Sequence, residues 1–352
     1  MRWDNLRLET GPPDDRLTAP LFEQGAVART FDTPEFRGMT FYEVHARSII
    51  NRVPEASRVP FRYTINPYRG CSHACVYCFA RKTHTYLDLD HGADFDTRIV
   101  VKVNAPQLLR KELSTRRWSG EHIAMGTNVD PYQRAEGRYR LMPGIIEALR
   151  DFANPFSILT KGTLILRDLD LLREASEVTE VGTNFSVGFV DDELSRLVEP
   201  GTPRPASRLE AVRKLNEAGI PCGVLMAPIL PFLTDDDEHL EATVAAVAGA
   251  GATHVSPIVL HLRPGAREWW LAWIERERPD LLPRYRDLYG RGAYAPKEYQ
   301  AEISAMVREL ARRHGVGRGN PREAGNPRRI PEEPPQPEQL TLEAQLESRS
   351  AR

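Results

Sequence analysis

Three of the four cysteines in this chain of 352 residues fall within eight positions: Cys71, Cys75 and Cys78, at the spacing C-x3-C-x2-C. Cysteine thiolates are the usual ligands of iron–sulfur clusters. A short loop with three cysteines would hold three irons of a 4Fe–4S cluster and leave the fourth iron open to another molecule. Gly70 lets the backbone turn just before the loop. We therefore predict a 4Fe–4S cluster with Cys71, Cys75 and Cys78 as its protein ligands.

Other interpretations of the same cysteines stay open at this point. A structural zinc site commonly uses two pairs of ligands, and only His73 and the distant Cys222 are at hand to complete one. Cys75 and Cys78 alone have the C-x-x-C spacing of a redox-active pair, but Cys71 has no place in such a pair. Cysteines that are simply buried would have no reason to cluster.

Together with its neighbours, the motif resembles the signature of radical S-adenosylmethionine enzymes. Tyr77 precedes the last cysteine, and the flanking segments 66–71 and 78–81 are similar to the branch that includes spore photoproduct lyase and its uncharacterised relatives. Further segments follow in the order that this branch uses, and the resemblance covers about residues 40–265: these segments are 126–133, 159–161, 167–169 and 228–231.

The resemblance implies an enzyme with two cofactors, a 4Fe–4S cluster and S-adenosyl-L-methionine (SAM). In such enzymes SAM chelates the open iron, and an electron from an external donor such as ferredoxin or flavodoxin splits its sulfonium. The resulting 5′-deoxyadenosyl radical abstracts hydrogen from a substrate, while the protein binds and orients the reactants. The branch suggests a macromolecular substrate, DNA or RNA.

The rest of the chain predicts an α/β fold. Short β-rich runs alternate with helical stretches, a pattern typical of a parallel sheet with right-handed crossovers. We expect a full or partial parallel barrel of the radical SAM type, an N-terminal extension over 1–55, a core over 56–265, a helical segment over 266–316 and a disordered tail over 317–352. The predicted strands lie at about 63–67, 99–103, 122–126, 156–160, 183–189, 222–227 and 254–260.

Barrel ligands bind at the carboxyl ends of the strands, and the family's contacts with SAM can be carried over to residues there. Tyr77 would lie near the adenine. Gly126 and Thr127 follow one predicted strand and would receive the methionine amino group, although the Gly-Gly-Glu element of many relatives is absent. Lys161 and Ser186 would bind the carboxylate and the ribose.

Several other polar residues receive a structural interpretation. Asp130 either assists at the amino group or starts a turn with Pro131, and His73 is interpreted as a hydrogen-bonding bystander in the loop. Two acid–base pairs are interpreted as structural ion pairs: Arg167 with Asp168, and Glu199 with Arg208. Photoproduct lyases use an additional cysteine as hydrogen donor near the end of the strand that here carries Gly126, so thymine-dimer repair is not expected.

Charge limits the other partners. The formal net charge is −2 and the pI is near 6.5, which exclude a globally basic protein, so nucleic acid would have to bind at a local patch. Residues 29–86 hold nine Arg or Lys against four Asp or Glu, interleaved with aromatic residues. A second hypothesis is therefore a non-catalytic iron–sulfur or zinc module that binds nucleic acid through this segment.

The ends of the chain complete these expectations. The start of the chain has no apolar signal region, and the sequence has no run of about 18 apolar residues, so we expect a cytoplasmic protein without a membrane span. The proline-rich tail is too polar to pack. Its segment Gln339–Leu342 resembles the short peptides by which bacterial DNA-repair and replication proteins bind the sliding clamp.

Overall fold

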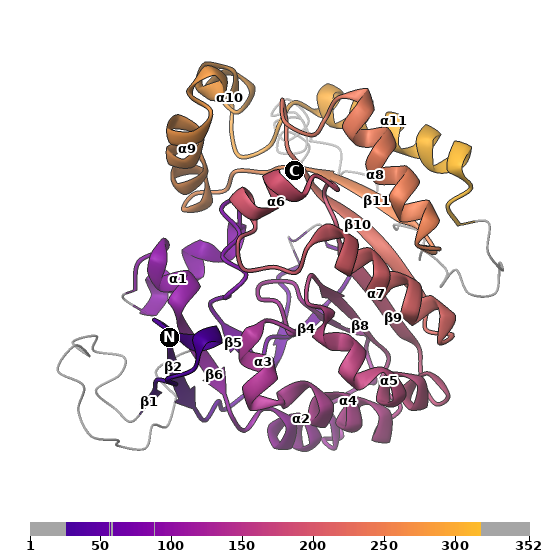
Figure 1. Cartoon of the computed structure of the whole chain (residues 1–352). Coiled ribbons are helices and arrows are strands. Elements are labelled where there is room, and N and C mark those ends of the chain that lie inside the picture. Colours follow the sequence, from indigo (N-terminus) through magenta and orange to yellow (C-terminus); the bar gives the residue numbers. More distant parts are fainter. Residues whose placement is uncertain (1–25, 56, 58, 88, 318–352) are drawn as a thin grey trace, which may run out of the picture.

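The computed structural model describes residues 26–55, 57, 59–87 and 89–317. Their largest element is a seven-stranded sheet with the order β11-β10-β9-β8-β7-β4-β3. Helices from the crossovers lie along one side of this sheet (Figure 1). Its strands are β3 (Ile50–Arg52), β4 (Tyr63–Ile65), β7 (Ile123–Met125), β8 (Phe156–Thr160), β9 (Val181–Ser186), β10 (Cys222–Ile229) and β11 (Val255–Val259).

Six neighbouring strands of the sheet, from β4 to β11, run parallel, and β3 adds an antiparallel edge. Because β3 and β11 are at opposite ends of the strand order, the barrel is partial. The predicted α/β fold with a mostly parallel sheet is confirmed. The helices between its strands are α2 (Ala105–Leu113), α4 (Leu141–Asp151), α5 (Leu169–Ser176), α7 (Pro205–Glu217) and α8 (Asp237–Gly249).

A second sheet of four strands corrects one part of the prediction. The run predicted at 99–103 forms β6 (Arg98–Lys102), but it lies in the order β1-β2-β6-β5 and not in the main sheet. Pro67 has no N–H and restricts the residue before it, so the main-sheet strand β4 ends at Ile65. The chain then pairs Tyr68 and Arg69 with β6. The other strands are β1 (Val27–Arg29), β2 (Thr40–Val44) and β5 (Tyr68–Arg69).

Several aromatic residues of the basic N-terminal segment pack against one another in the protein. Phe41 contacts both Phe31 and Phe36, with ring centroids 5.5 and 5.3 Å apart, and Tyr139 of α3 (Arg134–Tyr139) lies 5.7 Å from Phe41. Phe41 and Tyr68 are almost completely buried, so they are not free to stack on nucleobases as the second hypothesis requires. Phe31, Phe61 and Tyr63 are only partly buried.

In the described part of the chain after β11, the α-helices are α9 (Ala266–Glu277), α10 (Leu282–Leu288) and α11 (Lys297–His314), of which α11 packs on α8 and β11. Trp270 and Trp273 stack with centroids 5.0 Å apart in a separate core cluster. No helix in the described part of the chain is long and apolar enough to cross a membrane. The proposed clamp-binding segment Gln339–Leu342 lies outside the described residues.

Candidate active site

The cysteine loop runs from β5 to the 3-10 helix η2 (Phe79–Leu87) and is built from two tight turns. The N–H of Ala74 donates to the carbonyl of Cys71 at 3.1 Å, and the N–H of Cys78 donates to the carbonyl of Cys75 at 3.2 Å. Gly70 and Ala74 adopt positive φ, 81° and 54°, so the backbone reverses twice within the motif. Cys71 and Cys75 are buried, and Cys78 is partly exposed.

Neighbouring segments brace this loop through its backbone. The side-chain amide of Gln133 accepts from the N–H of Ser72 and donates to the carbonyl of Gly70, each at 2.9 Å. On the opposite side, the N–H of Gly201 donates to the carbonyl of His73 at 3.0 Å. A Cβ atom on Gly201 would lie 2.0 Å from the carbonyl oxygen of Ser72. Only glycine permits this close approach.

Arg81 is a third brace, and its side chain is fully buried. Its guanidinium donates to the carbonyl of Cys75 from Nε at 3.1 Å and from a terminal nitrogen at 2.9 Å. The same group forms an ion pair with Asp96 at 2.9 Å. It also lies 5.2 Å from the ring centroid of Phe95 and 5.1 Å from that of Trp269. Five donors in a planar fork suit this combination of acceptors and ring faces.

A cavity opens at the carboxyl ends of the main-sheet strands. It brings together all eight residues that the sequence analysis assigned to cofactors: Cys71, Cys75, Tyr77, Cys78, Gly126, Thr127, Lys161 and Ser186. The segment after β10, with Ala227 and Pro228, and the end of β11, with Leu260 and His261, form another wall. The predicted site residues therefore share one cavity although they come from four separate segments.

A buried polar network connects three of these residues. The Nζ of Lys161 donates to the hydroxyl of Ser186 at 2.6 Å and forms an ion pair with Glu199 at 3.1 Å. The hydroxyl of Tyr77 donates to the same carboxylate, which also pairs with Arg208. Burial alone would raise the pKa of Glu199, but the cations Arg208 and Lys161 outweigh it and lower the pKa to about 2. Glu199 is thus a fixed anion.

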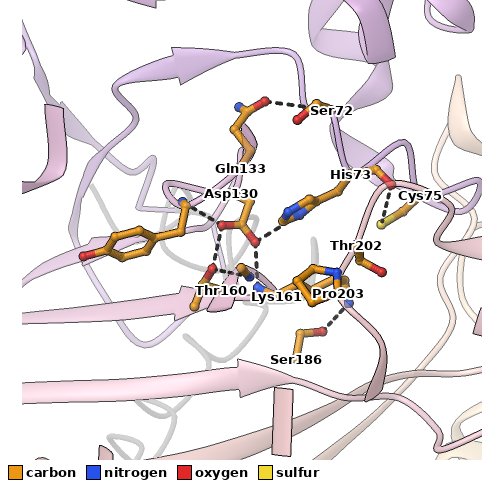
Figure 2. Close-up of polar contacts among 12 residues, drawn as sticks. Ser72, His73, Cys75, Asp130, Gln133, Thr160, Lys161, Ser186, Thr202 and Pro203 are labelled. Atoms are coloured by element: carbon orange, nitrogen blue, oxygen red, sulfur yellow. Dashed lines mark hydrogen bonds and ion pairs between the residues drawn. The ribbon is translucent and has the colours of Figure 1, made fainter. Parts of the chain in front are cut away.

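Asp130 is the second junction of the site (Figure 2). One carboxylate oxygen accepts from the N–H of Tyr132 at 2.8 Å and from the hydroxyl of Thr160 at 2.6 Å. The other accepts from the N–H of Lys161 at 2.6 Å and pairs with Nδ1 of His73 at 3.2 Å. Burial would raise the pKa of Asp130, but His73 and the hydrogen-bond donors lower it overall.

The loop after β7 presents two unusual positions to the cavity. Gly126 has φ of 86°, and a Cβ atom there would lie 1.8 Å from the carbonyl oxygen of Leu159. No side chain fits at this position without displacing β8. The hydroxyl of Thr127 is buried in the protein and has no hydrogen-bond partner there. Because an unpaired buried hydroxyl is costly, its position on the cavity wall favours a bound ligand with a polar group.

Comparisons with known proteins agree with this geometry. The radical SAM superfamily matches residues 65–244. The chain belongs to the radical SAM superfamily. An uncharacterised protein of Mycobacterium tuberculosis (strain H37Rv) is 49% identical over 311 residues, which cover 88% of this chain and 92% of that protein. An uncharacterised protein of Methanocaldococcus jannaschii is 32% identical over 195 residues, or 55% of this chain and 69% of the relative.

Solved structures of spore photoproduct lyase share the radical SAM fold. One, a mutant with dinucleoside spore photoproduct, covers 75% of this chain and 77% of its own, with 19% identity and a TM-score of 0.57. Another mutant with bound AdoMet and the same dinucleoside has 19% identity and a TM-score of 0.55 over the same shares. At this identity the similarity establishes the fold, and the expected resemblance to this branch is confirmed.

The cysteines fit the cluster that the radical SAM superfamily implies better than they fit a zinc ion. Among the described residues, no group of three His, Cys, Asp or Glu side chains is arranged to hold a single metal ion. Zinc draws its ligands to about 2.3 Å from one point, whereas a cluster spreads its cysteines over separate irons. Cys222 begins β10, at the opposite end of the sheet from the cavity, and His73 is paired with Asp130.

Burial sets the protonation state of the free loop. It raises the pKa of Cys71 well above the ordinary range of a thiol, raises that of Cys75 to about 12 and also raises that of Cys78. The free thiols are therefore protonated at neutral pH. A metal bound by these cysteines would have to displace those protons, as metal binding by cysteine does in general.

Two acidic residues of the site, Glu199 and Asp130, have more contacts in the structure than their interpretation from the sequence included. Glu199 was interpreted as a structural partner of Arg208, yet it also anchors Tyr77 and Lys161. Asp130 was weighed as a ligand of the amino group or a turn starter, and it is instead the point where three loops meet. Asp130 follows β7 and lines the cavity, so its place after a strand is the signal that could have found it. Glu199 follows the helix α6 (Asp192–Val198), and its sequence position gives no such signal.

Proposed function

We propose that this chain is a radical SAM enzyme whose 4Fe–4S cluster is held by Cys71, Cys75 and Cys78. SAM would lie beside the cluster, against Tyr77, Gly126, Thr127, Lys161 and Ser186. The observation that carries this proposal is the convergence of all eight residues on one cavity that also contains an unsatisfied buried hydroxyl.

The residues around the cavity have distinct tasks in this proposal. The ammonium of Lys161 offers a positive charge to the carboxylate of SAM, and Ser186 offers a hydroxyl to a ribose oxygen. Thr127 supplies the hydroxyl that is free to bind a polar group of the ligand. Glu199 holds Tyr77 and Lys161 in place through a hydrogen bond and an ion pair. When bound, the reduced cluster and SAM supply the radical chemistry.

Apolar walls suit radical chemistry because they exclude solvent and limit side reactions of a reactive intermediate. Leu225, Ile258 and Leu260 line the cavity beside the polar residues. We propose that the substrate enters here and loses a hydrogen atom, and that an external donor such as ferredoxin or flavodoxin supplies the electron. The structural neighbours bound to a dinucleoside photoproduct support a nucleic acid as the substrate class, through fold alone.

Repair of the spore photoproduct by the route that the resemblance implies is not part of this proposal. That route uses a cysteine as hydrogen donor near the end of the strand that here carries Gly126. A side chain at Gly126 would collide with the carbonyl of Leu159, and among the described residues the cavity is lined by no cysteine besides the three in the motif. Substrate chemistry therefore has to differ from that of photoproduct lyase.

The test is anaerobic reconstitution of the purified protein with iron and sulfide, followed by reduction with dithionite and addition of SAM. We expect the absorption and electron paramagnetic resonance of a 4Fe–4S cluster, and formation of 5′-deoxyadenosine. Substitution of Cys71, Cys75 or Cys78 by Ala should abolish both. Cys222→Ala is the matched control, because this cysteine is also buried but lies at the far end of the sheet. Wild-type protein that binds only a single colourless divalent ion would refute the proposal.

A further inference from the structure

The cysteine loop and the segment that carries Lys161 are bridged by Asp130, which lies in the loop between β7 and α3 (Figure 2). They also meet at the side chain of Lys161, whose Nζ lies 5.8 Å from the ring centroid of Tyr77. His73 comes from the cysteine loop, and Thr160 and Lys161 come from the end of β8. The side chains of Asp130 and His73 are only 9% and 4% exposed, so water does not compete effectively for these contacts.

The carboxylate of Asp130 has no capacity left for a ligand. A carboxylate offers about four lone-pair sites, and each oxygen of Asp130 already has two donors: the N–H of Tyr132 and the hydroxyl of Thr160 on one, the N–H of Lys161 and the ring of His73 on the other. The contact with SAM considered from the sequence would require one of these bonds to break. The role of Asp130 is therefore explained by the protein groups that it binds.

We propose that Asp130 is a positioning residue that sets the distance between the cluster loop and the SAM-binding residue Lys161. The inference rests on the proposed function, because it assigns the loop to a cluster and Lys161 to SAM. The contact between His73 and Asp130 fixes Asp130 relative to the cysteine loop. The hydrogen bond from the backbone N–H of Lys161 fixes the end of β8 relative to Asp130. The side chain of Lys161 then reaches Ser186 and Glu199 from a fixed starting point.

Asn in place of Asp130 is the sharpest perturbation. The amide keeps the shape of the carboxylate but replaces one acceptor oxygen by an NH2 group. The two donors that now bind that oxygen would then face another donor. Outer-sphere partners of metal sites typically change metal affinity by about 10–100-fold when removed. In the reconstituted holoprotein we expect Asp130→Asn to take up iron like wild type, to lose it to a chelator at least about tenfold faster, and to bind SAM at least about tenfold more weakly.

Asp168→Asn is the matched control. Asp168 is also a buried, ion-paired carboxylate, and it contacts the same tyrosine, Tyr132, through the phenol oxygen at 3.1 Å. Among the described residues, its polar contacts are with Tyr132 and Arg167. We expect Asp168→Asn to lower the melting temperature while leaving the iron-release rate and the dissociation constant of SAM within about twofold of wild type. Both constants are measured without turnover, by chelator kinetics and calorimetry.

A second pair of variants covers the case in which Asp130→Asn fails to fold. His73→Asn keeps an N–H donor near the position of Nδ1, whereas His73→Leu removes the donor and leaves the other three bonds of Asp130 intact. We expect His73→Leu to release iron faster and to bind SAM more weakly, and His73→Asn to recover most of both losses. In a double-mutant cycle, Thr160→Val and His73→Leu should be non-additive, because both act through one carboxylate.

The outcomes separate this inference from the proposed function. If the wild-type protein takes up no cluster, the proposed function fails and the positioning role fails with it. If wild type binds cluster and SAM, but Asp130→Asn and His73→Leu match Asp168→Asn in iron release and SAM binding, only the positioning role is overturned. In that case Asp130 would contribute to folding alone.

Discussion

Arg81 offers a direct test of how the cysteine loop is held. Its guanidinium forms an ion pair with Asp96 at 2.9 Å, and it donates twice to the carbonyl of Cys75. It also donates to the carbonyls of His91 and Gly92 at 3.2 and 2.9 Å. Replacing Arg81 by Met keeps much of the volume but removes every donor.

The expected cost follows from what remains after the substitution. Asp96 would keep a largely buried carboxylate without its cation, and breaking a buried pair in this way costs about 3–5 kcal/mol. The freed carbonyls add to this cost unless water reaches them. For a chain of this size, about 2 °C of melting temperature is lost per kcal/mol. We therefore expect Arg81→Met to melt roughly 6–10 °C below wild type.

The assay compares thermal unfolding of Arg81→Met, Arg81→Lys, Asp96→Leu and the double variant that combines Arg81→Met with Asp96→Leu. Lys restores the charge but not the planar fork, so Arg81→Lys should fall between wild type and Arg81→Met. The double variant should recover part of the loss, because it removes the stranded carboxylate as well. Equal melting temperatures for Arg81→Met and wild type, or a double variant less stable than the sum of the two single changes predicts, would refute this reasoning.

Three further predictions concern the fold and the cavity. Gly126→Ala should lower the free energy of unfolding in urea by about 2–5 kcal/mol, because alanine is strained at φ of 86° and its Cβ would collide with the carbonyl of Leu159. Gly219→Ala is the control: φ is 80° but the space around it is open, so only the strain of the positive φ should appear. Burial lowers the pKa of His84 to about 4. The unfolded chain therefore binds the proton first, so stability on the order of 3 kcal/mol should be lost as pH falls from about 6.5 to 4, and His84→Gln should flatten this slope. Glu199→Gln should lower the free energy of unfolding by about 3–5 kcal/mol, because the buried Arg208 loses its anionic partner. It should also weaken SAM binding in calorimetry, because Lys161 loses its ion pair. Unchanged SAM affinity would contradict the role assigned to Glu199.

The parts of this protein that a single sequence predicts are those encoded by local spacing. The cysteine motif lies within eight residues, and six of the seven predicted strands occupy the main sheet close to their expected positions. Strand β6 was misplaced because an alternating α/β pattern does not say which sheet a strand joins. The break after Ile65 depends on Pro67 and on pairing with β6, which become visible only in three dimensions.

The parts that were missed depend on contacts between distant positions. Tyr77 and Glu199 are 122 residues apart in sequence, and the four donors of Asp130 come from three segments. An acidic residue after a strand is more often a turn or a surface partner than a junction, so spacing alone favours the structural interpretation. Burial distinguishes the two cases, because a carboxylate held away from water must find several donors.

The two carboxylates, Glu199 and Asp130, hold Lys161 at two different points. Glu199 fixes the side-chain end of Lys161, at 3.1 Å from Nζ, while Asp130 fixes its backbone N–H at 2.6 Å. A lysine side chain ordinarily carries large rotational freedom, and ordering it costs up to about 2 kcal/mol. Holding both ends before a ligand arrives means that this entropy is lost during folding and not during binding. The arrangement therefore favours a cavity in which Lys161 is already placed when an anionic group of a ligand enters.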